Sequence, residues 1–169
     1  MRFLWVDRVV ELHRERRIVV ALDVTRDEAL FAHHFPLRPM FPASLLFESA
    51  AQGGTILLET SLGFTRKALP GYIASAKFYR AIGPGDALRI ELDAEQWSED
   101  AAVLDGRVLR GRERCASLRF GMLTAPLREF YGPEHFAGYR AMYAGWLGNA
   151  ELHGFCTHPL EELDHAIAG

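Results

Sequence analysis

A histidine and a glutamate stand on either side of a proline-rich segment and could carry out acid–base chemistry. His34 opens this segment, and Glu48 lies in the apolar run that follows it. A carboxylate among apolar residues is costly to bury unless it is hydrogen-bonded, protonated or used chemically. Free imidazole has a pKa of about 6.5, so a neutral histidine can accept a proton near neutral pH. The two residues are therefore candidates for a general base and a general acid.

The apolar run predicts a helix that is buried on most sides. Pro42 suits the first turn of a helix, where its missing N–H does no harm, and roughly the next 16 residues are apolar almost all round. Before it, two short runs at residues 6–12 and 18–24 predict a β-hairpin. Residues 25–41 contain helix-disfavouring prolines and predict an ordered loop. The candidate base thus lies in a loop beside the start of the helix that carries the candidate acid.

The helix needs other elements to cover it, and the rest of the chain supplies strands. Short apolar or alternating runs predict four of them, at residues 71–80, 88–93, 103–110 and 114–123. The order of strand, strand, helix and four strands predicts an α+β fold, in which an antiparallel sheet wraps around one long central helix. We expect this single domain to occupy residues 1–125.

Residues 126–169 predict a helical and loop extension. Four aromatic residues recur there at helical spacing behind Pro133, namely Phe136, Tyr139, Tyr143 and Trp146. We expect this stripe to pack on the domain's own surface, and a lid or a partner site is the alternative. A compact group of His153, Cys156 and His158 lacks the paired spacing of a metal site, so we expect no metal.

The segment from His34 to Gln52 resembles a known family signature. It has the pattern His34-Phe35-Pro36-x-x-Pro39-x-x-Pro42-x-x-Leu45-x-x-Glu48-x-x-Ala51-Gln52, which resembles that of the 3-hydroxyacyl-acyl carrier protein dehydratases of fatty-acid synthesis. The strand and Pro-Gly-Asp turn at residues 76–86 look like the family's next element. The resemblance covers about residues 3–125 and implies a hot-dog fold.

The resemblance also implies a reaction. The enzyme would dehydrate a (3R)-3-hydroxyacyl thioester carried on acyl carrier protein to the trans-2-enoyl thioester, in fatty-acid or specialised lipid or polyketide synthesis. In the family, two subunits pair edge to edge, and each site takes its histidine from one subunit and its carboxylate from the other. His34 would be the base and Glu48 the acid, in a homodimer or an assembly of dimers. Glutamate rather than aspartate at position 48 resembles the subfamily that does not isomerise the product.

Five further residues are expected to bind or position the substrate. Backbone N–H groups at a helix start are unsatisfied, so Ala43 and Ser44 are candidates to stabilise the developing enolate oxygen. Gln52 stands one turn beyond Glu48, where an amide can orient a carboxyl group. Leu37 adds bulk beside His34, and Phe78 is expected to line the acyl chain.

Three positions depart from the family pattern and keep other functions open. His33, Leu37 and Ala43 stand where the family usually has glycine. One alternative is therefore a catalytically silent hot-dog subunit that binds acyl chains or pairs with an active homologue. The other is a hot-dog thioesterase, which would use a carboxylate to activate water and release free acid.

The composition of the chain limits the partners and the cellular compartment that we expect for it. The formal net charge is -3, which offers no general attraction for nucleic acid, although Arg14, Arg16, Arg17 and Arg80 could form a basic landing area for the acidic carrier protein. No apolar run is long enough for a membrane span, and two cysteines suit a reducing compartment. We expect a soluble, cytoplasmic protein. No nucleotide-binding or serine-nucleophile motif occurs, and the implied reaction needs no cofactor.

Overall fold

The computed structural model describes residues 4–25 and 29–168. Part of the predicted loop, residues 26–28, lies outside the described residues. The elements follow one another as β1 (Arg8–His13), β2 (Arg17–Asp23), η1 (Ala29–Ala32), α1 (Ala43–Ser61), β3 (Arg66–Phe78), β4 (Ala87–Trp97), β5 (Ala101–Arg110), β6 (Glu113–Pro126), η2 (Leu127–Glu129), η3 (Pro133–His135), α2 (Phe136–Leu147), β7 (Glu151–His153) and α3 (Pro159–Ala168).

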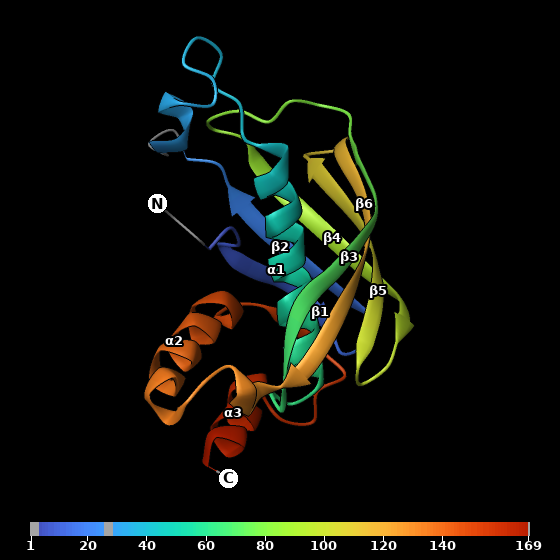
Figure 1. Cartoon of the computed structure of the whole chain (residues 1–169), viewed down its shortest axis with the longest axis vertical. Helices are drawn as coiled ribbons and strands as arrows, with labels where there is room; N and C mark the ends of the chain where they lie inside the picture. The colour runs from blue at the N-terminus through green and yellow to red at the C-terminus, as the bar shows by residue number, and fades with distance from the viewer. Residues whose placement is uncertain (1–3, 26–28, 169) are drawn as a thin grey trace.

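One seven-stranded sheet curls around α1 (Figure 1). Its strand order is β3-β6-β5-β4-β2-β1-β7. All neighbours are antiparallel except β1 and β7, which are parallel. The predicted α+β arrangement of an antiparallel sheet around one central helix is confirmed, with β7 as an addition that the prediction lacked.

Two adjacent glycines let α1 lie close against the sheet. A Cβ atom on Gly53 would come within 3.1 Å of Leu92 Cδ1, and one on Gly54 would come within 2.7 Å of Leu104 Cδ1. Both leucines are fully buried. Glycine in a helix interior costs about 0.5–1 kcal/mol relative to alanine. Here that cost is offset by the closer packing of α1 against the sheet, which fixes the positions of the remaining side chains on the helix.

Strand β3 forms an unpaired edge of the sheet. It pairs with β6 on one side only, and residues 69–80 are all exposed. Large apolar side chains on this strand, among them Tyr72 and Ile73, are about half exposed at 52% and 54%. The strand begins at Arg66, five residues earlier than predicted, because Pro70 is tolerated on an edge strand. A long, exposed apolar edge is a ready template for pairing with another strand.

The C-terminal extension adds more than the predicted helix. It contains α2 where the aromatic stripe predicts it, and then β7 and α3, which were not predicted. The two helices lie near the C-terminal end of α1, far from the loop at residues 29–41 (Figure 1). The boundary between residues 125 and 126 remains a prediction. Among the described helices, none is both long and apolar enough to cross a membrane.

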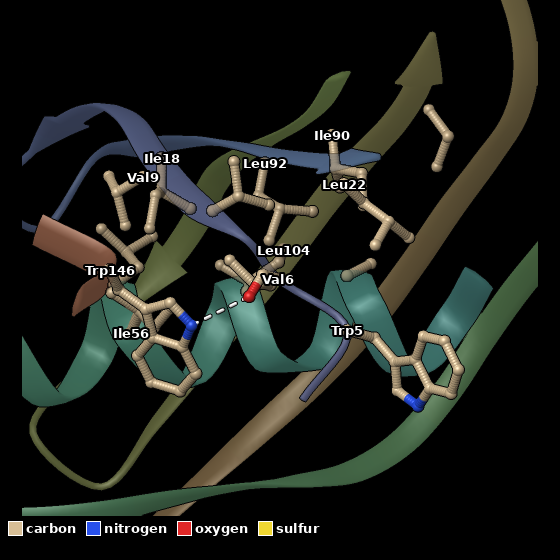
Figure 2. Packing of buried hydrophobic residues seen from close by; sticks show 14 of the residues in the cluster. Trp5, Val6, Val9, Ile18, Leu22, Ile56, Ile90, Leu92, Leu104 and Trp146 are labelled. Carbon is tan, nitrogen blue, oxygen red and sulfur yellow. Dashed lines mark hydrogen bonds between the residues drawn. The ribbon is translucent and has the colours of Figure 1, made fainter. Parts of the chain in front are cut away.

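The N-terminal segment joins α1 to α2. Trp146 on α2 donates from Nε1 to the carbonyl oxygen of Val6 at 3.0 Å (Figure 2). The backbone N–H of Trp5 donates to Gln52 Oε1 on α1 at 2.7 Å. Trp5 also meets Phe41 edge to face, with ring centroids 5.3 Å apart. This segment therefore forms one wall of any space between the two helices.

Enlarging Gly54 tests the close approach of α1 to the sheet. Gly54→Val is expected to lower the free energy of unfolding by about 1–3 kcal/mol, because the added methyls overlap side chains that cannot move away. The matched control is Gly138→Ala on α2, where a Cβ meets nothing within 4 Å. Urea denaturation should show the first variant destabilised and the control unchanged or slightly stabilised. Equal stability of both variants would contradict the packing argument.

Candidate active site

The loop that holds the candidate base is closed by hydrogen bonds between His34 and Met40. His34 Nδ1 lies 2.9 Å from the carbonyl oxygen of Met40, and the Met40 N–H donates to the His34 carbonyl at 3.0 Å. The Phe41 N–H donates to the Ile82 carbonyl at 2.7 Å, which ties the loop to the connection between β3 and β4. The His34 ring stacks on Phe35, with centroids 4.4 Å apart. The imidazole is therefore held in one orientation by backbone geometry.

The carbonyl partner decides which ring nitrogen carries the hydrogen. A carbonyl oxygen can only accept, so Nδ1 of His34 must be the donor. In the neutral imidazole Nε2 is then unprotonated, with its lone pair pointing away from this bond. Within residues 4–25 and 29–168 no hydrogen-bond partner is recorded for Nε2. The geometry therefore leaves a proton acceptor available.

Glu48 is held from its own helix. Gln52 Nε2 donates to Glu48 Oε1 at 2.9 Å, and Gln52 Oε1 accepts the Trp5 N–H. Because the amide is fixed at both ends, its NH2 group must face the carboxyl group. Glu48 is half-buried, so it is neither freely solvated nor sealed in the core. The arrangement presents one carboxyl group in a defined orientation.

The start of α1 offers unsatisfied donors. Pro42 caps the helix without a side-chain hydrogen bond, and its carbonyl accepts from Leu45 and Leu46. For the Ala43 and Ser44 N–H groups no acceptor is recorded within the described part of the chain. Both residues are exposed, so these donors at the positive end of the helix dipole are open to a ligand.

A cavity of about 230 Å³ lies against Glu48. The lining comes from α1, the N-terminal segment, the start of β3 and the C-terminal extension, and consists of Leu4, Glu48, Ala51, Gln52, Thr55, Lys67, Ala68, Leu69, Pro70, Tyr131, Met142, Tyr143 and Trp146. His34 is not among these residues. No hydrogen bond or ion pair between His34 and Glu48 is recorded either, within the described residues.

The other predicted binding residues are scattered in the single chain. Leu37 is fully exposed at 100% on the His34 loop, and Phe78 is 43% exposed at the end of β3. Neither lines the cavity beside Glu48. A single chain thus gathers Glu48 and Gln52, leaves the Ala43 and Ser44 N–H groups exposed at the helix start, and keeps His34, Leu37 and Phe78 apart from this cavity.

Sequence reasoning missed a second carboxylate on the same helix face. Glu59 has no exposed surface and accepts four hydrogen bonds. Its Oε1 accepts from Lys67 Nζ at 2.6 Å and from the Ala68 N–H at 3.0 Å, while its Oε2 accepts from the hydroxyls of Tyr139 and Tyr143. A lone glutamate near the end of a buried helix, eight residues before a lysine, was the available signal.

The two tyrosines are held in their protonated forms. Burial is the largest cause that raises the pKa of Tyr139 and of Tyr143, and the neighbouring Glu59 charge raises both further. Their edge-to-face contacts with Phe64 fix the rings. Glu59 therefore anchors α2 to α1 through two hydroxyls that must remain donors.

Removing these hydroxyls should change how stability depends on pH. An unfolded tyrosine ionises near pH 10, whereas these two keep their protons in the fold, so their contribution is present below about pH 10 and is lost above it. The double variant Tyr139→Phe with Tyr143→Phe should be less stable than wild type near neutral pH, by ~1–3 kcal/mol for each lost bond. It should also lose less stability between about pH 9 and pH 11. Denaturant titrations at several pH values measure both effects, and parallel curves would contradict them.

The histidines and cysteines of the tail do not gather. His153 stacks on His13, with centroids 4.2 Å apart, and Cys156 is exposed. Among residues 4–25 and 29–168, no group of three or more histidine, cysteine, aspartate or glutamate side chains could hold a metal ion.

Comparison with known proteins gives a consistent family. Residues 1–119 match the family of FabA-like domains. A 3-hydroxyacyl-acyl-carrier-protein dehydratase FabZ from Koribacter versatilis is 38% identical over 110 residues, which is 64% of this chain and 70% of that protein. The FabZ from Symbiobacterium thermophilum is 35% identical over 130 residues, 75% of this chain and 92% of that protein.

Solved structures agree on the fold. The acetyl-CoA-bound protein smu.793 from Streptococcus mutans has a TM-score of 0.59 at 16% identity and covers 75% of this chain and 94% of its own. The dehydratase heterocomplex ApeI:P from Xenorhabdus doucetiae has a TM-score of 0.54 at 13% identity, with 73% and 84% covered. At these identities the likeness concerns the hot-dog fold alone.

Proposed function

Because this chain belongs to the FabA-like family of hot-dog proteins, we propose that it dehydrates 3-hydroxyacyl chains carried on acyl carrier protein. The substrate is the (3R)-3-hydroxyacyl thioester, and the product is the trans-2-enoyl thioester and water. The observation that carries this proposal is the match of residues 1–119 to the family, together with FabZ relatives that share up to 92% of their length with it. The enzyme is thus a carbon–oxygen lyase.

His34 and Glu48 divide the proton transfers. The neutral His34 imidazole accepts the C2 proton at Nε2, and the electron pair of that C–H bond moves into an enolate. Glu48 gives a proton to the C3 hydroxyl, which leaves as water while the C2–C3 double bond forms. Each positioned transfer of this kind typically contributes about 10²–10⁴-fold in rate. The hydrogen bond from Gln52 to Glu48 Oε1 leaves Oε2 as the oxygen that faces the substrate.

The enolate oxygen needs donors that are already in place. The N–H groups of Ala43 and Ser44 at the start of α1 meet this need. Alanine at position 43 keeps the N–H that the family's glycine provides, so the departure there is compatible with activity. Leu37 and Phe78, both exposed in the single chain, are then free to contact the acyl chain or the partner subunit.

Two subunits are needed to complete each site. The exposed edge of β3 supports pairing of two chains into one continuous sheet. The cavity beside Glu48 lacks His34, which supports the supply of that imidazole by the partner. Each homodimer would then hold two sites, each composed of His34 from one chain and Glu48 from the other.

Complementation of two inactive variants tests this assignment. His34→Ala and Glu48→Gln should each lower the rate of enoyl thioester formation by about 10²–10⁴-fold. When the two variants are unfolded together and refolded as a mixture, mixed dimers carry one intact site, so about one quarter of wild-type activity should return. If each variant alone stays active, the residues are wrong. If the mixture stays inactive while dimers form, the site lies within one chain.

The basic landing area predicted for the carrier protein consists of Arg14, Arg16, Arg17 and Arg80, and most of these arginines form ion pairs within the chain. Arg14 pairs with Glu162, Arg17 with Asp93 and Arg80 with Glu113. Arg16 is exposed with no ion pair recorded among the described residues, but its neighbour Glu15 donates its N–H to Ser61 at the end of α1 opposite the His34 loop. Arg38 is exposed on the His34 loop itself, and no ion-pair partner is recorded for it within the described residues. We therefore assign carrier attraction to Arg38.

Charge reversal at this arginine tests the assignment. Arg38→Glu should lower kcat/KM for a carrier-bound substrate by about tenfold at low salt, and much less at high salt. The same substrate on pantetheine alone should be unaffected. Arg128→Glu is the matched control. Arg128 is an exposed arginine on η2. The neighbouring Leu127 N–H donates to the Thr65 carbonyl just after the end of α1, so η2 lies at the opposite end of that helix from the His34 loop. Equal losses in both variants would contradict the proposal.

The thioesterase alternative has no specific support. Thioesterases occur among the solved structures of similar fold, but at 12–13% identity. Free thiol released from an acyl thioester would favour it, whereas a new conjugated double bond from the 3-hydroxyacyl thioester favours dehydration. Both cysteines are free thiols, which suits a reducing, cytoplasmic setting.

A further inference from the structure

The cavity beside Glu48 has a second polar end that the dehydration step does not use. Glu48 and Gln52 stand at one end, and Lys67 and Tyr131 line the other. Thr55 lies between them on α1, about 10 Å along the helix axis from Glu48. Apolar side chains fill much of the remaining wall, including Met142 and Trp146 of α2. An acyl chain of the substrate whose reactive carbons lie at Glu48 could extend along this wall toward Lys67.

Most polar groups of the lining are already committed. Gln52 bonds Glu48 and Trp5, Thr55 donates to the Ala68 carbonyl, and Tyr143 donates to Glu59. For the Tyr131 hydroxyl no hydrogen-bond partner is recorded within the described residues. Lys67 also keeps unused donors. Its ammonium has three N–H donors, of which Glu59 takes one, and it lies 5.9 Å from the centroid of the Tyr131 ring.

The remaining donors of Lys67 face a confined space. Its side chain is only 13% exposed, and an N–H that is shielded from water costs free energy unless an acceptor meets it. Glu59 already balances the lysine charge. A neutral oxygen, such as a hydroxyl or a carbonyl, therefore matches this end better than a carboxylate, which would add an unbalanced charge, or a methyl group, which cannot accept.

From these observations we propose that the cavity receives the far end of the acyl chain, and that Lys67 selects chains that end in a neutral hydrogen-bond acceptor. Met142 and Trp146 of the extension close this space and limit the length of the chain. A volume of about 230 Å³ lies below the ~300–1,000 Å³ usual for small-molecule pockets, so the cavity limits the length of the chain that it can hold. The inference rests on the proposed function, since it takes Glu48 to act on the reactive carbons.

Three carrier-bound 3-hydroxyacyl substrates of equal length test the selection. They end in a methyl group, a hydroxyl group and a carboxylate. Wild type should show a kcat/KM about tenfold higher for the hydroxyl-ended chain than for the methyl-ended one. The difference should lie in KM, because a contact remote from the reacting carbons stabilises substrate and transition state alike. Preference for the carboxylate-ended chain would overturn the assignment of a neutral group.

The lysine is tested in a background that keeps the buried charges balanced. Lys67→Met with Glu59→Gln removes both charges and retains the length of the lysine stem. This double variant should lose the preference for the hydroxyl-ended chain. If it folds and the preference persists, Lys67 is not the selecting group. If wild type dehydrates none of the substrates, the proposed function fails instead, so the two failures are distinguishable.

A second variant tests the cavity without disturbing the buried pair. Met142 is half-buried on α2, so Met142→Trp should fill the space with little effect on folding. It should lower kcat/KM for an eight-carbon chain relative to a four-carbon chain by about tenfold, and Met142→Ala should shift the ratio the other way. The conservative Met142→Leu is the matched control. Unchanged ratios in both variants would show that the acyl chain does not enter this cavity.

Discussion

The structure depends on a carboxylate that has no access to solvent. Glu59 lies in α1 with no exposed surface, where an unpaired carboxylate would be strongly destabilising. Lys67, the Ala68 N–H and two tyrosine hydroxyls satisfy it. These donors come from the start of β3 and from α2, so the central helix, the edge strand and the extension are joined at one point. None of the three can move far without leaving this charge unpaired.

The two faces of the central helix have different contacts along its length: one face packs against the sheet, and the other carries polar side chains. One face carries Gly53 and Gly54, which have no side chains and allow contact with Leu92 and Leu104 of the sheet. The other face carries carboxylates and amides that need partners. The glycines set how closely the helix approaches the sheet, and the buried carboxylate sets how the helix is rotated about its own axis. The orientation of Glu48 therefore follows from the packing of α1 in the fold and not from the loop that precedes the helix.

Sequence patterns predicted the elements that have a simple periodicity. The buried helix, the hairpin and the alternating strands confirm that apolar spacing and prolines are sufficient signals there. Strand β7 has only three residues, too few for a periodic pattern. Helix α3 has Leu160, Leu163 and Ile167 at helical spacing behind Pro159, a signal that the prediction did not use. The tyrosine partners of Glu59 lie 80 and 84 positions away, and such distances leave no trace in local spacing. Only Lys67, eight positions further on, is near enough in sequence to have indicated a pair. The roles of His34 and Glu48 remain predictions, since their meeting depends on a second chain.

The Glu48 end of the cavity is built by one part of the chain, whereas the far end combines Lys67 of β3 with residues of the C-terminal extension. Glu48 and Gln52 belong to the family domain, whose match ends at residue 119, whereas Tyr131, Met142 and Trp146 lie beyond it. Substitutions in the extension can reshape the far end of the cavity while the carboxyl group keeps its partner. The constraint on such changes is Glu59, because any replacement of Tyr139 or Tyr143 must still satisfy its oxygens. A related chain that varies its preferred substrate should therefore vary the wall residues of α2 and keep donors at these two positions.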